Sequence, residues 1–264
     1  MRKIILVLLI FSPIAGCRAQ NHIEAPPGTK PLPSRATALA PSGPEAEARL
    51  LAEHADLGIR AGPTLIIRYA GEDPVTLVDD PKGCNPHSVA NVIMVKAGPG
   101  PRLSPIAEIR CHFGSLDNLY LLLPDGDKFP IVDEVSASPD GQTLAMADNS
   151  MGPGPNRGRF TLINWPTLNK AASFPAGCHV VAWQSSDSLT AHCWHNDGSE
   201  PTDADDSRSV YFAARIFRVS KGPWQLKGTA WLGSDFSSLK DAKGALPSFS
   251  GLSFDDGSMD QPQN

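Results

Sequence analysis

The sequence is poor in the features that mark several common functional classes. Aromatic residues make up 7% of its 264 residues and charged residues 19%. Its 23 basic residues are outnumbered by 28 acidic ones, giving a formal net charge of −5, so the basic excess of a typical nucleic-acid binder is missing. The apolar run at residues 4–11 is shorter than the roughly 20 residues that cross a bilayer as a helix. The composition therefore predicts no nucleic-acid partner and no membrane-spanning helix.

Motifs of catalysis and metal binding are also missing. No P-loop, GxSxG elbow, HExxH or EF-hand spacing is present. Ser237 and Lys240 match an S-x-x-K pattern, but the SDN and KTG motifs that accompany it in enzymes are absent. One loop is crowded with acidic residues, in an order that matches no known calcium loop: Asp197, Glu200, Asp203, Asp205 and Asp206. The sequence thus predicts no catalytic residue, no metal site and no cofactor.

Long amphipathic helices are missing too, whereas 23 glycines and 25 prolines supply many turns. From residue 63 onward, short runs rich in β-branched and aromatic residues alternate with turn clusters, which is typical of hairpins. Hairpins of one kind start at Thr64, Leu119, Phe160 and Ile216. Hairpins of a second kind lie at residues 135–147 and 180–191, with a truncated copy at residues 252–259. Without helices between the strands, parallel βαβ units are not expected.

One turn carries a resemblance to a known fold. Ser138-Pro139-Asp140-Gly141, followed by an apolar strand, resembles the blade-start motif of WD40-like and TolB-type β-propellers, and Asn164-Trp165 fits the end of their outer hairpin. The resemblance covers about residues 132–194, and the hairpin spacing implies roughly four blade-sized units, few for a closed propeller. We therefore expect an all-β domain of antiparallel hairpin repeats, forming a small or incomplete propeller-like array. A β-sandwich of the same hairpins is the alternative.

The N-terminus has the pattern of an export signal. Arg2 and Lys3 precede the apolar run, and small residues follow it, as in secretory signal peptides. The residues Ile14-Ala15-Gly16-Cys17 resemble the lipobox of bacterial lipoproteins, which implies that Cys17 is acylated and becomes the new N-terminus. By resemblance to Gram-negative lipoproteins, Arg18 favours sorting to the outer membrane, with the body facing the periplasm. Ordinary cleavage after Ala19 is the alternative.

These observations divide the chain into four segments. Residues 1–16 are the predicted signal peptide, and residues 17–58 a lipid-anchored, proline-rich tether with one short helix at residues 45–54. Residues 59–254 form the predicted propeller-like domain, and residues 255–264 a polar tail.

Four cysteines remain once Cys17 is assigned to the lipid anchor. An even number in an exported chain indicates disulfides, for which three pairings exist in principle. A regular hairpin around residues 184–187 pairs Trp183 with Ser188 and places Cys178 directly opposite Cys193, at a distance suited to a bridge. Cys84 and Cys111 flank residues 90–95 and 106–109, which pair across the turn at residues 98–101. We therefore predict the disulfides Cys84–Cys111 and Cys178–Cys193.

The same register decides against a zinc site. Cys178-His179 and His192-Cys193 together contain a plausible set of zinc ligands. Neighbouring residues of a strand point to opposite faces, so the two cysteines lie on one face and the two histidines on the other. A structural or surface role is therefore expected for His179, His192 and His195.

Export, disulfides, hairpin repeats and the missing catalytic constellation favour a non-catalytic lipoprotein that binds a protein partner, of the envelope-assembly or toxin-immunity type. The tryptophans offer a binding surface, although most are expected in the core: Trp165, Trp183, Trp194, Trp224 and Trp231. The alternative is a propeller-type, metal-dependent hydrolase or lactonase, with His87, His112, Asp117 and Asp148 converging at a central funnel. Binding of a small ligand or sugar is a third hypothesis.

Overall fold

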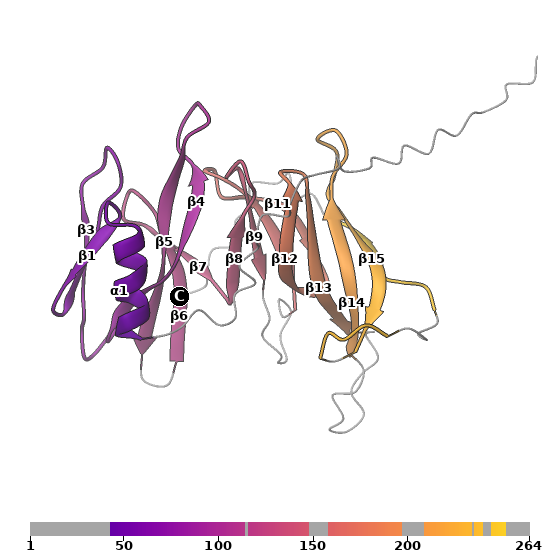
Figure 1. Ribbon diagram of the computed structural model, residues 1–264, viewed down its shortest axis with the longest axis horizontal. Coiled ribbons are helices and arrows are strands. Elements are labelled where there is room, and N and C mark those ends of the chain that lie inside the picture. Colours follow the sequence, from indigo (N-terminus) through magenta and orange to yellow (C-terminus); the bar gives the residue numbers. More distant parts are fainter. Residues whose placement is uncertain are drawn as a thin grey trace, which may run out of the picture. The chain divides into compact units, whose positions relative to one another are not determined.

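The computed structural model describes residues 43–113, 116–147, 158–196, 209–233, 235–239 and 244–251. These residues form one helix and four antiparallel sheets that follow one another along the chain (Figure 1). Within each sheet, strands consecutive in sequence are hydrogen-bonded neighbours. The prediction of an all-β domain of antiparallel hairpin repeats is confirmed, and the described sheets do not close into a barrel, as in an incomplete propeller-like array. The predicted signal peptide, Cys17, the truncated hairpin and the polar tail lie outside the described residues.

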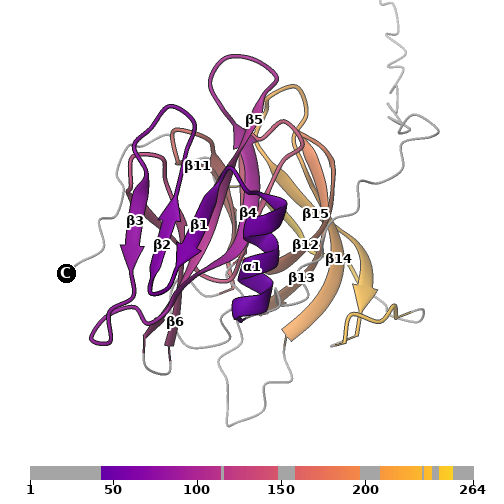
Figure 2. The same ribbon diagram turned by 60° about the vertical axis from the view of Figure 1, so that its left-hand side comes forward.

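The helix α1 (Pro44–Glu53) lies where the sequence predicts it. Proline occupies its first turn together with Glu45 and Glu47, and both features suit a helix N-terminus. The buried Glu47 carboxylate accepts hydrogen bonds from Nε and Nη2 of Arg60 at 2.6 and 3.0 Å, and from the backbone N–H of Val89 at 2.9 Å. Because Arg60 and Val89 belong to different sheets, Glu47 ties the helix to both (Figure 2).

The first two sheets account for residues 58–131. The first sheet contains β1 (Gly58–Ala61), β2 (Thr64–Ile67) and β3 (Val75–Val78). The second sheet contains β4 (His87–Lys96), β5 (Leu103–Phe113), β6 (Leu116–Leu122) and β7 (Lys128–Ile131). The predicted hairpins are present as the pairs β2–β3, β4–β5 and β6–β7. The sequence prediction missed β1, whose four residues include one β-branched side chain, Ile59, between glycine and alanine ends that disfavour strands.

The last two sheets account for residues 134–250. The third sheet contains β8 (Glu134–Ala137), β9 (Thr143–Ala147), β10 (Phe160–Asn164) and β11 (Asn169–Phe174). The fourth sheet contains β12 (Gly177–Ser185), β13 (Ser188–Asn196), β14 (Ser209–Phe217), β15 (Gln225–Leu232) and β16 (Ser248–Ser250). Each of the four predicted hairpins of the first kind therefore lies in a different sheet.

The Ser138–Gly141 turn connects β8 to β9 in the third sheet and is hydrogen-bonded to the second sheet. The Ser138 hydroxyl donates to Oδ1 of Asp140 at 2.7 Å and accepts from the backbone N–H of Thr143 at 3.0 Å. Gly141 has φ +66°, and its carbonyl accepts from the backbone N–H of Lys96 at 3.0 Å. A Cβ at Gly141 would lie 2.4 Å from that nitrogen, so only glycine permits this approach. The Nε1 atom of Trp165 donates to the Lys96 carbonyl at 2.9 Å.

Two clusters of buried apolar side chains fill the spaces between the sheets. The first cluster draws on all of the first three sheets, including Leu65, Ile109 and Leu144. The second lies between the third and fourth sheets and includes Phe160 and Phe212.

Helix α1 has ten residues, and the described part of the chain contains no helix with the length and apolar character needed to cross a membrane.

The structure contains both disulfides that the sequence predicts. Cys178 and Cys193 are direct partners in the β12–β13 register, with their Cα atoms 4.0 Å apart. Cys84, which precedes β4, is bonded to Cys111 of β5, with Cα atoms 5.0 Å apart. The predicted register at the tip of the β12–β13 hairpin is wrong, because Trp183 pairs with Leu189 and not with Ser188. Two irregularities in β12, one between Val180 and Ala182 and one between Trp183 and Ser185, restore the predicted pairing at the cysteines.

Candidate functional site

The alternation of β12 and β13 separates cysteines from histidines, as predicted. Cys178 and Cys193 are fully buried in the second apolar cluster, between the third and fourth sheets. His179 and His192 are the next cross-strand pair and therefore point to the opposite face. Trp194 is two residues beyond His192, and Tyr211 on β14 is its cross-strand partner, so both rings share the face of the two histidines. We call this surface, together with Phe236 packed against it, the histidine face.

The rings of the histidine face pack around Phe236. The Phe236 ring is stacked on His192 at a centroid distance of 5.3 Å and an interplanar angle of 21°. It meets His179 and Tyr211 edge to face, at 5.9 and 5.7 Å. His179 also lies 5.5 Å from Trp194. All of these distances fall within the range of favourable aromatic contacts.

These rings are accessible to solvent. The side chain of His179 is 47% exposed, and the other four rings are half-buried. Aromatic residues are enriched in protein interfaces, and tryptophan and tyrosine are frequent among the residues that contribute most to binding.

A short loop after β15 holds Phe236 in place. The backbone N–H of Gly233 donates to the Ser237 carbonyl at 2.7 Å, and that of Phe236 donates to the Gly233 carbonyl at 2.8 Å. Oδ1 of Asp235 accepts from the backbone N–H of Ser237 at 2.9 Å, and hydrogen bonding to Ser237 lowers the pKa of Asp235. Phe236 has φ +61°, a conformation that a bulky residue rarely adopts. The loop therefore fixes the ring over the sheet.

Glycine creates the space for Trp194. A Cβ at Gly177, the cross-strand partner of Trp194, would lie 2.2 to 2.9 Å from three carbons of the indole ring. The indole therefore packs directly against the glycine.

Glu134 places a carboxylate beside the rings. Its Oε2 atom lies 3.2 Å from Nδ1 of His179, which donates to it, and its side chain is 13% exposed. Glu134 begins β8, so this contact joins the third sheet to the fourth. The pKa of His192 is lowered, first by burial and second by the charge of His179.

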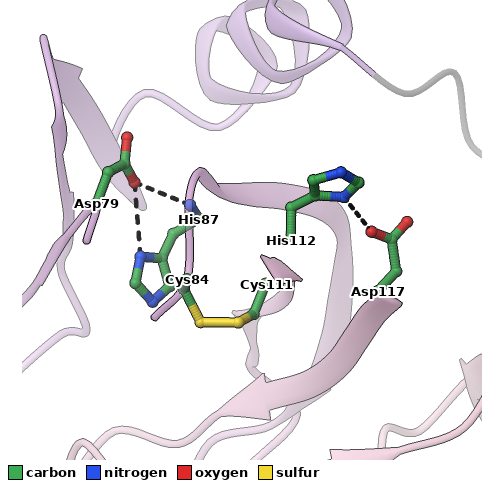
Figure 3. Close-up of a disulfide and its surroundings, with 6 residues drawn as sticks. All are labelled: Asp79, Cys84, His87, Cys111, His112 and Asp117. Atoms are coloured by element: carbon green, nitrogen blue, oxygen red, sulfur yellow. Dashed lines mark hydrogen bonds and ion pairs between the residues drawn. A yellow bond between two sulfur atoms is a disulfide. The ribbon is translucent and has the colours of Figure 1, made fainter. Parts of the chain in front are cut away.

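A second group of titratable residues surrounds the Cys84–Cys111 disulfide (Figure 3). The backbone N–H of His87 donates to Oδ1 of Asp79 at 2.8 Å, and the imidazole Nδ1 lies 3.5 Å from the same oxygen. His112 forms a separate pair with Asp117, whose Oδ2 atom lies 3.7 Å from Nε of Arg110. Figure 3 shows the disulfide between the two pairs. Burial is the first cause that lowers the pKa of His87, followed by the charge of Lys128, while Asp79 opposes them.

The four residues of the hydrolase hypothesis are thus only partly brought together. His87 and His112 lie in different pairs, and Asp148 is outside the described residues. A shallow, open depression adjoins His112 and is lined by Pro81, Lys82, Gly83, Asn85, His112 and Phe113. Among the residues that the structure describes, no group of three or more histidine, cysteine, aspartate or glutamate side chains is arranged to hold a metal ion.

The remaining predicted residues have varied positions. His195 lies apart from the histidine face, where its Nδ1 atom donates to the Pro175 carbonyl at 2.6 Å and its ring contacts Phe249 at 5.0 Å. Trp224 is buried, and Trp165, Trp183 and Trp231 pack partly buried against the apolar clusters, as expected of most tryptophans. Ser237 is exposed, while Lys240 and the acidic loop lie outside the described residues.

Sequence reasoning identified three members of the histidine face, His179, His192 and Trp194, but not the other contributors. Phe236 and Glu134 come from a loop and from another sheet, and no spacing in the sequence connects them to β12. The chain matches no family model, and searches of curated proteins and of solved structures give no significant match.

Proposed function

We propose that the protein is a lipid-anchored protein of the bacterial cell envelope that binds a protein partner without catalysis. Acylation at Cys17 holds it in the outer membrane, and the proline-rich tether carries the sheet array into the periplasm. The histidine face is the docking surface. The proposed roles are envelope assembly and toxin immunity.

One observation carries the proposal: five aromatic and imidazole rings gather on one sheet face and remain half-buried or exposed. The cysteines and apolar side chains on the opposite face of the same strands pack into the second apolar cluster, so ordinary core packing already uses the other side of the sheet. Because a strained loop residue, Phe236, is needed to complete the cluster, the arrangement serves more than the coverage of apolar surface.

The proposal is tested by affinity capture from envelope extract with the mature chain. The Phe236→Ala variant removes the central ring of the histidine face. Phe113→Ala is the matched control, because Phe113 is a 50% exposed phenylalanine on the second sheet. Thermal melts of both variants establish that they fold.

Support requires a partner that the native protein and Phe113→Ala both retain and that Phe236→Ala loses. A partner retained equally by all three proteins would show that the histidine face is not the docking surface. Failure of the native protein to retain any specific partner would count against the binding function itself.

A further inference from the structure

We infer that the histidine face binds a lysine or arginine side chain presented by the protein partner. This inference deepens the proposed function and rests on it, because it names the chemistry of the group that the docking surface accepts. The partner is therefore a protein whose contact segment is basic.

The aromatic rings of the histidine face favour a cationic side chain. The faces of tryptophan, tyrosine and phenylalanine rings attract cations, and Trp194, Tyr211 and Phe236 lie together on one surface. The edge-to-face packing of Phe236 against Tyr211, with an interplanar angle of 83°, presents ring faces in two directions. Such a surface suits the stem of a lysine or arginine as well as its charged end.

Carboxylates near the rings also favour a cation. Glu134 lies beside the rings, and its carboxylate is hydrogen-bonded to His179. Asp235 is exposed and precedes Phe236 in the same loop, and hydrogen bonding to Ser237 lowers its pKa. Carboxylates thus accompany the rings, and charge complementarity selects a cation.

The imidazole of His192 does not oppose this selection at neutral pH. The pKa of His192 is lowered, so its ring is uncharged and can stack against a guanidinium or an alkyl stem. The groups facing it are the rings of His179 and Phe236, with Glu134 beyond His179. A carboxylate from a partner would instead meet Glu134 and Asp235, whose charges repel it.

The experiment uses three synthetic peptides with the mature protein at pH 7.5. Their sequences are acetyl-Gly-Ser-Lys-Gly-Ser-amide and the same peptide with glutamine or glutamate in place of lysine. Binding is followed by nuclear magnetic resonance, through the shift of the Trp194 indole N–H. The lysine peptide is expected to cause a saturable shift, whereas the other two are not.

Two variants separate a specific site from general attraction to an acidic protein. Glu134→Gln is expected to weaken lysine-peptide binding about fivefold, the upper range for a solvent-accessible ion pair, whereas Glu72→Gln, with the same charge change at an exposed position of the first-sheet loop, leaves it unchanged. Equal weakening in both variants would reduce the effect to net charge and overturn the inference.

The remaining outcomes are also decisive. Preference for the glutamate peptide, or no shift of Trp194 with any peptide, would overturn the inference that the site takes a cation. Neither result would by itself remove the docking function, because that function is judged separately by the capture experiment with Phe236→Ala and Phe113→Ala.

Discussion

Glu108 is a buried carboxyl group whose ionisation we expect to govern the pH dependence of folding stability. It lies on β5 with only 6% of its surface exposed, and Nδ2 of Asn91 donates to its Oε2 at a long 3.4 Å. Burial is the largest cause that raises its pKa to about 7; Asn91 and Arg110 oppose the shift, and Glu134 adds to it.

The sign of the effect follows from proton binding. Between its ordinary pKa of 4.5 and about 7, Glu108 holds a proton in the folded protein and loses it in the unfolded chain. The free energy of unfolding therefore falls as the pH rises through this interval. The separation of the two pKa values corresponds to a loss of about 3 kcal/mol, complete above the folded value.

The Glu108→Gln variant keeps the shape of the side chain and the hydrogen bond from Asn91 but cannot ionise. Below about pH 5 we expect the variant and the native protein to unfold at similar urea concentrations. At pH 8 the variant should be more stable by up to about 3 kcal/mol. Urea denaturation followed by tryptophan fluorescence, at half-unit steps from about pH 4 to 8, measures the difference.

The difference between the two proteins isolates Glu108 from other titrating groups. His87 and His192, whose pKa values are lowered, make the opposite contribution, because the unfolded chain binds more protons than the folded one below pH 6.5. This contribution is present in both proteins and cancels. Glu72→Gln, at an exposed position, is the control and should follow the native profile. A stability difference between Glu108→Gln and the native protein that does not change with pH would refute the reasoning.

Three further predictions concern the disulfide, the histidine face and the anchor. Replacing both Cys178 and Cys193 with alanine should lower the free energy of unfolding by about 3 kcal/mol, as measured by urea denaturation, because the bridge closes a loop with a sequence separation of 15 residues. Gly177→Ala should displace the indole of Trp194, seen as a changed fluorescence maximum with little change in far-UV circular dichroism, and an unchanged spectrum would contradict the packing. Cys17→Ser should abolish incorporation of labelled palmitate and move the protein out of the membrane fraction; continued labelling would place the lipid elsewhere.

The hairpins could be predicted because their signals are local. Alternating apolar residues and a turn cluster such as Gly71-Glu72-Asp73-Pro74 lie within fifteen residues of each other, and the pairs β2–β3, β6–β7 and β10–β11 follow directly. The register at the tip of β12–β13 could not be predicted, because bulges depend on packing between sheets and leave no signature in the pattern.

The site is less predictable than the fold for a similar reason. The pairing of His179 with His192 follows from the register that the sequence predicts at the two cysteines, and their shared face follows from strand alternation. The positions of Phe236 and Glu134 depend on how a loop returns over the fourth sheet and on how the third sheet packs beside it. The burial of Glu108 could not be predicted, because a single carboxyl among the apolar residues of β5 does not interrupt the strand pattern.

The Cys178–Cys193 disulfide and the two imidazoles of the histidine face lie on opposite faces of the same two strands, β12 and β13. The bond between Cys178 and Cys193 fixes the separation of β12 and β13 at one register position, and His179 and His192 occupy the next. Because strand neighbours point to opposite faces, the covalent bond in the core sets the spacing of the two imidazoles on the other face. Phe236 then packs against two imidazoles whose positions are already fixed. Under the proposed function, this lowers the conformational entropy that these side chains would lose when the partner binds. The alternation that rules out a zinc site at these four residues is thus the same alternation that supports the proposed docking surface.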